Sequence, residues 1–287
     1  MGISGLSSGT TYYYRIAAQN SAGTSYGSEA SFTTSAPADT TAPSGSISIN
    51  SGTSYANSTT VTLSLSATDS VGVTGYYLSD SSTTPSASAS GWTSVTSTTS
   101  YSASVSYFLS SGEGSKTIYA WYKDAAGNVS STASDSITLD TTAPTVTISS
   151  PTSNSTYTST SSTISLGGSA SDSTSGISTV TWSNNKGGSG TASGTTSWSI
   201  SSIGLSTGEN IVTVTATDGA GNTGAGTIKV TYTISAPTVT TTAATNVTSN
   251  AATLNGTVNA NGLSTTAWFQ YGISLQGLIA IQRQHKV

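Results

Sequence analysis

Two triplets of aspartate are the residues of this chain whose type and spacing best suit chemistry. The first triplet is Asp39, Asp69 and Asp124, and the second is Asp140, Asp172 and Asp218. Calcium is bound by about six to eight oxygen atoms from carboxylates, carbonyls and water. Three converging carboxylates and the neighbouring loop carbonyls would therefore form a calcium site. The alternative is that each aspartate only accepts hydrogen bonds from the backbone N–H groups of its own turn.

Each triplet falls at the same three places of a repeated sequence. The phrase Asp-Thr-Thr-Ala-Pro occurs at 39–43 and again at 140–144. A loop from Asp to Gly follows in each copy, at 69–72 and 172–176, and an Asp-x-Ala-Gly-Asn turn closes each copy, at 124–128 and 218–222. A unit of about a hundred residues is thus present twice, which indicates an array of similar domains.

Alternation of apolar and polar residues predicts β-strands as the elements that hold these loops. Val61–Ala67 and Val212–Ala216 alternate strictly, which places one face on a core and the other in water. Threonine suits the wet face because its β-branched side chain packs well on a pleated sheet. No segment has a helical pattern, so we expect an all-β chain. The predicted strands lie near 45–50, 60–68, 73–79, 91–95, 101–109, 116–123 and 128–139 in the first repeat, and near 144–150, 162–171, 177–183, 192–200, 210–217 and 224–233 in the second.

Both repeats resemble bacterial immunoglobulin-like domains. The likeness is carried by Lys116–Asn128 in the first repeat and by Asn210–Asn222 in the second. It implies one β-sandwich over 37–140 and another over 141–234. In such a sandwich the start of the domain, the loop after the second strand and the last hairpin lie toward one end. Each aspartate triplet would then converge at a domain junction, although these motifs specify fold better than function.

The flanking segments resemble parts of fibronectin type III domains. Residues 1–36 are similar to the last strands of that fold, with Leu6 and Tyr12 at the position of its tyrosine corner. Residues 235–272 are similar to its opening strands. We therefore expect the chain to begin inside one fibronectin type III domain and to stop inside another.

The last fifteen positions, 273–287, form an anomalous tail. They contain Arg283, His285 and Lys286 and almost no Ser or Thr, unlike the rest of the chain. A partial gene product or a change of reading frame would explain this shift in composition.

Aromatic residues suggest a second kind of site, because sugar rings stack on exposed aromatic faces. We single out Trp92 and Trp198 as candidates for carbohydrate binding if their rings are exposed. Trp182 and Trp268 fall on probable third strands, where an inward Trp commonly fills a sandwich core. Core filling is the competing interpretation for every aromatic here, since exposed rings become informative only as a patch.

Composition excludes several other functions. Only 6% of the 287 residues are charged, the formal net charge is −4 and no basic cluster exists, so nothing indicates nucleic acid as a partner. No apolar stretch is long enough to span a bilayer. The chain has no cysteine and a single histidine, His285, so Cys–His catalysis is excluded and a Ser-His-Asp arrangement would depend on the tail. We expect no catalytic residues and no cofactor other than calcium.

The leading hypothesis is a non-catalytic spacer in a larger bacterial cell-surface or secreted protein. Its partners would be the neighbouring domains of that protein. A second hypothesis is an adhesion or carbohydrate-binding accessory module that contacts surface glycans or cell-surface proteins, and a third is a decoration of a phage virion. No signal peptide is visible after Met1, so the extracellular or surface location is inferred from the type of module.

Overall fold

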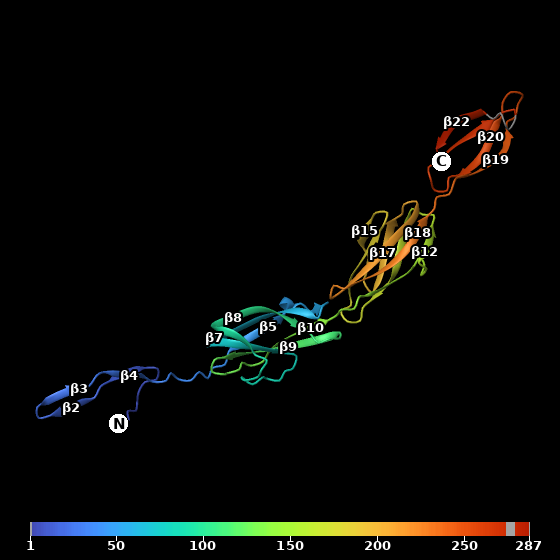
Figure 1. Ribbon diagram of the computed structural model, residues 1–287. Coiled ribbons are helices and arrows are strands. Elements are labelled where there is room, and N and C mark those ends of the chain that lie inside the picture. Colours follow the sequence, from blue (N-terminus) through green and yellow to red (C-terminus); the bar gives the residue numbers. More distant parts are fainter. Residues whose placement is uncertain (1, 274–278, 287) are drawn as a thin grey trace. The chain divides into compact units, whose positions relative to one another are not determined.

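The computed structural model describes residues 2–273 and 279–286 and is built almost entirely of β-strands (Figure 1). This confirms the all-β fold class. The chain divides into two compact units, of which one ends at Thr141 and the other begins at Thr142. In the part of the chain that is described, no helix is long and apolar enough to cross a bilayer.

The first unit begins with two small antiparallel pairs. Strand β1 (Thr11–Tyr14) pairs with β4 (Ala30–Thr33), and β2 (Ala17–Asn20) pairs with β3 (Gly23–Tyr26). The backbone N–H of Ser7 donates a hydrogen bond to the Tyr12 hydroxyl at 2.8 Å. A tyrosine hydroxyl bonded to backbone a few residues upstream is the arrangement of a tyrosine corner, as the sequence resemblance implied.

The body of the first unit is a β-sandwich, called the first sandwich below. Its strands are β5 (Ser44–Ile49), β6 (Tyr55–Ala56), β7 (Thr60–Ser79), β8 (Thr93–Phe108), β9 (Gly114–Asp124) and β10 (Ala133–Leu139). They hydrogen-bond in the order β5-β7-β9-β10-β6, and β8 also pairs with β7. A short 3₁₀ turn, Asn50–Gly52, follows β5.

Strand β7 is the element that links the two layers of this sandwich. Its first half pairs with β5 and its second half with β9, and the pairing register shifts between Thr68 and Val73. The sequence predicted two strands here, at 60–68 and 73–79, but the chain bends at Asp69–Gly72 without leaving the sheet. The two strands predicted at 91–95 and 101–109 are likewise one strand, β8.

The core of the first sandwich follows the alternation seen in the sequence. Val61, Leu63, Leu65 and Ala67 are at most 2% exposed, whereas the residues between them face water. They pack with Ile47, Ile49, Ile118, Tyr122, Ile137 and Leu139 from the neighbouring strands.

The second unit contains the second sandwich, which has two sheets. One sheet holds β11 (Thr145–Ser150), β13 (Thr163–Ser171) and β16 (Ser197–Gly204), paired in that order. The other holds β12 (Thr156–Ser159), β18 (Thr223–Tyr232), β17 (Gly208–Asp218), β14 (Ile177–Asn184) and β15 (Ser189–Thr191), paired in that order. The alternation on β17 places Val212, Val214 and Ala216 in the core, each at 0% exposure.

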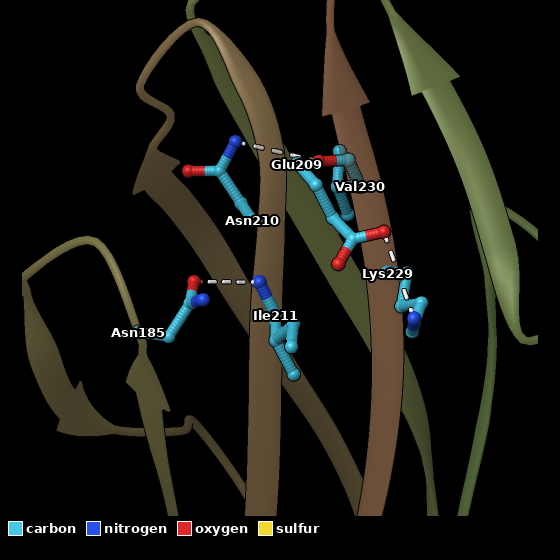
Figure 2. A network of polar contacts seen from close by, with 6 residues as sticks. All are labelled: Asn185, Glu209, Asn210, Ile211, Lys229 and Val230. Carbon is cyan, nitrogen blue, oxygen red and sulfur yellow. Dashed lines mark hydrogen bonds and ion pairs between the residues drawn. The ribbon is translucent and has the colours of Figure 1, made fainter.

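A buried asparagine closes one end of the second core. Asn210 is 0% exposed, and its side-chain amide donates to the carbonyl oxygens of Ser206 at 2.7 Å and Val230 at 3.3 Å. At the next residue of β17, the Ile211 N–H donates a hydrogen bond to Oδ1 of the exposed Asn185 at 2.7 Å (Figure 2). The interior amide is thus fully engaged by backbone groups, as a buried polar group must be.

The C-terminal flank has two antiparallel pairs. Strand β19 (Thr238–Thr245) pairs with β20 (Thr253–Asn259), and β21 (Thr266–Tyr271) pairs with β22 (Ile279–Lys286). Of the predicted tail 273–287, positions 274–278 and 287 lie outside the described residues. Trp268 on β21 is 51% exposed, so the expectation that it fills a core is wrong.

Candidate metal centre

The structure brings Asp39, Asp69 and Asp124 together at the end of the first sandwich where β5 begins. One carboxylate oxygen of each lies within 4.8 Å of the others. The pairing register explains the convergence, because Ser44 lies opposite Thr68 and Val73 lies opposite Asp124. The segment that leads into β5, the bend in β7 and the last residue of β9 therefore meet at one end of the sandwich.

Asp39 and Asp69 each use one oxygen to fix their own turn. The Thr41 N–H donates to Asp39 Oδ1 at 3.0 Å. The Val71 and Gly72 N–H groups donate to Asp69 Oδ1 at 2.9 and 2.7 Å. These are the turn contacts that the alternative interpretation of the sequence predicts.

Their second oxygens are different. Asp39 Oδ2 and Asp69 Oδ2 are both buried, and no described residue gives either of them a hydrogen bond. Asp69 as a whole is only 7% exposed. Buried carboxylate oxygens without partners are costly unless a positive charge compensates them.

Asn128 joins Asp124, the third member of the cluster, to Asp39. Its side-chain amide donates to Asp124 Oδ2 at 2.7 Å and to the Asp39 carbonyl oxygen at 3.2 Å. Its backbone N–H donates to Asp124 Oδ1 at 2.9 Å. This role of Asn128 was not predicted, although its place at the end of the repeated Asp-x-Ala-Gly-Asn turn was the signal.

The donor set of this cluster fits a calcium ion. All the side-chain ligands are carboxylate oxygens, which hard cations prefer, and no His or Cys is among them. Two oxygens on opposite sides of a calcium ion are about 5 Å apart, given Ca–O distances of about 2.3–2.6 Å, so a spread of 4.8 Å suits one shared ion. An open hollow of about 300 Å³, lined in part by Thr41, Asp69 and Ser70, borders the cluster at Asp69.

In the second sandwich, Asp172 and Asp218 occupy the corresponding loop and turn. Their nearest carboxylate oxygens also lie within 4.8 Å of each other. Asp172 Oδ1 accepts hydrogen bonds from the N–H groups of Thr174, Ser175 and Gly176, at 2.9–3.1 Å. Asp218 Oδ2 accepts the Asn222 amide at 2.9 Å, as Asp124 does with Asn128.

Asp140, the counterpart of Asp39, is the last residue but one of the first unit. It follows β10, its side chain is 0% exposed, and its backbone N–H donates to the Ala56 carbonyl oxygen at 2.9 Å. Its assignment to the second triplet rests on the repeated Asp-Thr-Thr-Ala-Pro phrase.

The two tryptophans chosen as sugar-binding candidates have other surroundings. Trp198 is 2% exposed and lies in the second core, so the prediction that its ring is available to a sugar is wrong. Trp92 is partly exposed, but Lys123 Nζ lies 4.9 Å from its ring centroid and the Tyr77 ring packs edge-on at 5.6 Å. Trp182, expected in the core, does pack against it.

Trp92 belongs to an aromatic cluster that the sequence did not reveal. Trp121 lies on the outer face of β9, on the opposite side from Ala120 and Tyr122, and yet it is 0% exposed. Tyr77 and Tyr119 pack on its ring at 6.1 and 6.2 Å. The segment 80–92 lies against this cluster, and the Lys123 ammonium fastens it through a hydrogen bond to the Ala87 carbonyl at 2.9 Å.

Both sandwiches are antiparallel except for one parallel pair each, β6 with β10 and β12 with β18, and such two-layer sandwiches are the architecture of immunoglobulin-like modules. Residues 144–230, which span the second sandwich, match the family model of the bacterial Ig domain. This confirms the resemblance to bacterial immunoglobulin-like repeats.

Several solved structures match the chain at low sequence identity. The fibronectin(III)-like modules of Clostridium thermocellum CbhA are 18% identical, with a TM-score of 0.35 over 65% of this chain and 93% of theirs. A Ca²⁺-stabilized adhesin from an Antarctic bacterium that binds ice is 23% identical, with a TM-score of 0.42 over 83% and 60%. A tetra-tandem repeat from the extending region of a large adhesion protein is 23% identical, with a TM-score of 0.35 over 96% and 70%. No curated protein matches the chain.

Proposed function

We propose that this chain is a non-catalytic spacer segment of a larger bacterial protein, secreted or displayed on the cell surface, and that calcium stiffens its modules. The observation that carries the proposal is the Asp39, Asp69 and Asp124 cluster with its two buried, unpartnered oxygens. Tandem immunoglobulin-like modules supply the spacer, and its partners are the neighbouring domains of the same protein.

Calcium would act by joining three segments that are far apart in the sequence. The segment before β5 carries Asp39, the bend of β7 carries Asp69, and the end of β9 carries Asp124. Without a cation, three carboxylates at this distance repel one another. A bound ion would replace that repulsion with attraction and fix the point at which the chain enters the sandwich. The segment leading into the first sandwich would then have fewer accessible orientations.

The repeat extends the proposal to the second sandwich. Asp172 and Asp218 lie in the loop and the turn that correspond to those of Asp69 and Asp124 in the first repeat. Asp140 begins the second Asp-Thr-Thr-Ala-Pro sequence, as Asp39 begins the first. We therefore propose a second calcium site formed by Asp140, Asp172 and Asp218.

Thermal unfolding of the full chain with excess calcium and then with chelator tests the calcium sites. A ligand bound only to the folded state raises stability by about 2.7 kcal/mol at a hundred times its Kd, so the melting temperature should rise by several degrees. Asp69→Asn, which keeps the shape of the side chain and removes its charge, should abolish the rise for the first sandwich. Asp80→Asn, at an exposed aspartate outside the cluster, is the matched control.

Two results would contradict the calcium sites: an unchanged melting temperature, or an equal rise in Asp69→Asn and Asp80→Asn. The spacer role has a separate test, small-angle X-ray scattering of the full chain with and without calcium. An extended particle that calcium makes less variable supports the spacer, whereas a compact particle in both conditions contradicts it.

A further inference from the structure

The long strand β8 leaves one edge of the first sandwich unpaired. It runs for 16 residues, Thr93–Phe108, and pairs along its length with β7. No other described strand pairs with it. By contrast, the second sandwich has edge strands of three residues (β15), four (β12), six (β11) and eight (β16). A long strand with a free edge presents a row of N–H and C=O groups to which another strand can bond.

The part of this edge from Tyr101 to Phe108 lacks the features that usually block such pairing, and the pairing of β8 with β7 is irregular only before it, between Ser94 and Ser100. Proteins protect edge strands with charged side chains, proline, bulges in the edge strand or short length. Thr93–Phe108 contains no charged residue and no proline. Only the Thr98 hydroxyl covers part of it, since this group contacts the Ser100 carbonyl oxygen at 2.9 Å and the Ser100 N–H at 3.4 Å. The stretch Tyr101–Phe108 has no such cover from any described residue.

The inward-facing residues of this stretch are also only partly covered. Tyr101, Val105 and Tyr107 pack against the core but stay half-buried, whereas Leu63 and Leu65 on the adjacent strand are at most 2% exposed. Phe108, on the outer face, is 75% exposed. A strand added beside β8 would bury more of this apolar surface, which stabilises the pairing by about 25 cal/mol per Å².

We propose that β8 pairs antiparallel with β8 of a second copy of this chain, with the two-fold axis at Ser104. This register sets Tyr101 opposite Tyr107 and Ala103 opposite Val105 on the inner face, and Ser102 opposite Ser106 on the outer face. Aromatic and Ser/Thr pairs are favourable across antiparallel strands. In this register the side chains of the two β8 strands match on both the inner and the outer face of the sheet. The strand also carries no charge that would repel its own copy, so a second copy is the partner that it fits. A two-fold interface uses the same patch on both molecules.

Sedimentation of the full chain over a range of concentrations tests the pairing. The average mass should rise from 28.5 kDa toward twice that value as concentration increases. Ser104→Lys places two like charges at the axis and should weaken association several-fold. Ser136→Lys, at an exposed serine on β10, adds the same charge elsewhere and should leave association unchanged. Circular dichroism checks that both variants fold.

Cross-linking tests the register, because the chain has no native cysteine. Ser104→Cys should form a disulfide dimer with itself on mild oxidation. Ser102→Cys and Ser106→Cys should cross-link efficiently only when mixed with each other, and Ser136→Cys should not cross-link. A mass that stays at 28.5 kDa, a dimer unaffected by Ser104→Lys, or equal cross-linking at all four positions would overturn the proposal.

Discussion

The first sandwich buries Tyr122 against Gly45, and the second buries Trp198 against Gly168. In each, a Cβ on the glycine would collide with the aromatic ring and with a backbone carbonyl oxygen, that of Ser66 at Gly45 and that of Thr147 at Gly168, so only glycine fits there. Tyr122 satisfies its hydroxyl by donating to the Ser46 carbonyl at 2.6 Å, whereas Trp198 Nε1 is buried and finds no partner among the described residues. The interiors are thus filled in different ways.

The turns at one end, however, are the same in both sandwiches. Asp124 with Asn128 and Asp218 with Asn222 form matching hydrogen bonds, and Asp69 and Asp172 each receive backbone N–H groups from a loop that ends in glycine. Packing can be solved by many residue combinations, while a cluster of carboxylates needs particular residues at particular places. The two sandwiches therefore differ in their core residues and agree in their aspartate turns, which supports the proposal that the turns carry the function.

Truncating the buried indole should have the largest effect and should be confined to one unit. Trp198→Ala should lower the unfolding free energy of the second sandwich by about 3–5 kcal/mol, because it leaves a cavity in the core. Hydrogen exchange measured by mass spectrometry reports each unit separately. Trp92→Ala, at a partly exposed ring of the first unit, should cost clearly less. An equal loss of protection from hydrogen exchange in both units of Trp198→Ala would contradict this prediction.

Removing the buried amide should have a smaller effect, again in the second unit. Asn210→Ala leaves the carbonyl oxygens of Ser206 and Val230 without their donor, which costs about 1–3 kcal/mol. Asn185→Ala is the matched control, because Asn185 is exposed and its Oδ1 accepts one backbone N–H (Figure 2). Chemical denaturation should show a clear loss for the first variant and a slight one for the second. Similar losses would mean that burial of Asn210 matters little.

Raising the pH above about 10 should destabilise the first sandwich through Tyr122. At neutral pH, removing the Tyr122 hydroxyl should have the smallest of the three effects predicted here. Burial raises the pKa of Tyr122 from its ordinary value near 10 to about 12. The folded state therefore keeps its proton when the unfolded state has lost it, so the unfolding free energy falls as pH rises from about 10 to about 12. Tyr122→Phe should cost about 1 kcal/mol at neutral pH and weaken this alkaline loss.

Denaturation curves across the alkaline range check this result. Burial also raises the pKa of Tyr101 and Tyr107 in the same sandwich, so some loss should persist in Tyr122→Phe. An unchanged pH dependence in that variant would show that Tyr122 does not contribute to it.

The sequence predicted the strands and turns well, but it did not predict which tryptophan side chains are buried by other parts of the chain. The alternation Val61–Ala67 predicted β7 and its core face, and the Asp-to-Gly loops predicted the turns that now hold the carboxylates. Trp198 was misjudged although Ser197-Trp-Ser-Ile200 alternates and places it on the same face as Ile200, which is 5% exposed. The burial of Trp121 could not have been predicted from the alternation, because the cover comes from side chains on the outer face of the sheet, the rings of Tyr77 and Tyr119 and the Thr132 hydroxyl that accepts its N–H.

The direction of the strands in the first sandwich has a mechanical consequence. The chain enters at Ser44, at the end of the sandwich where β9 finishes with Asp124, and leaves at Leu139, opposite Gly114 at the start of β9. Tension on the two ends would draw β5 and β10 in opposite directions along their own lengths. The hydrogen bonds that hold β5 to β7 and β10 to β9 would then be loaded together in shear rather than opened one after another. Such a module would yield only at high force, and an ion between Asp39 and Asp124 would hold the point at which that force arrives.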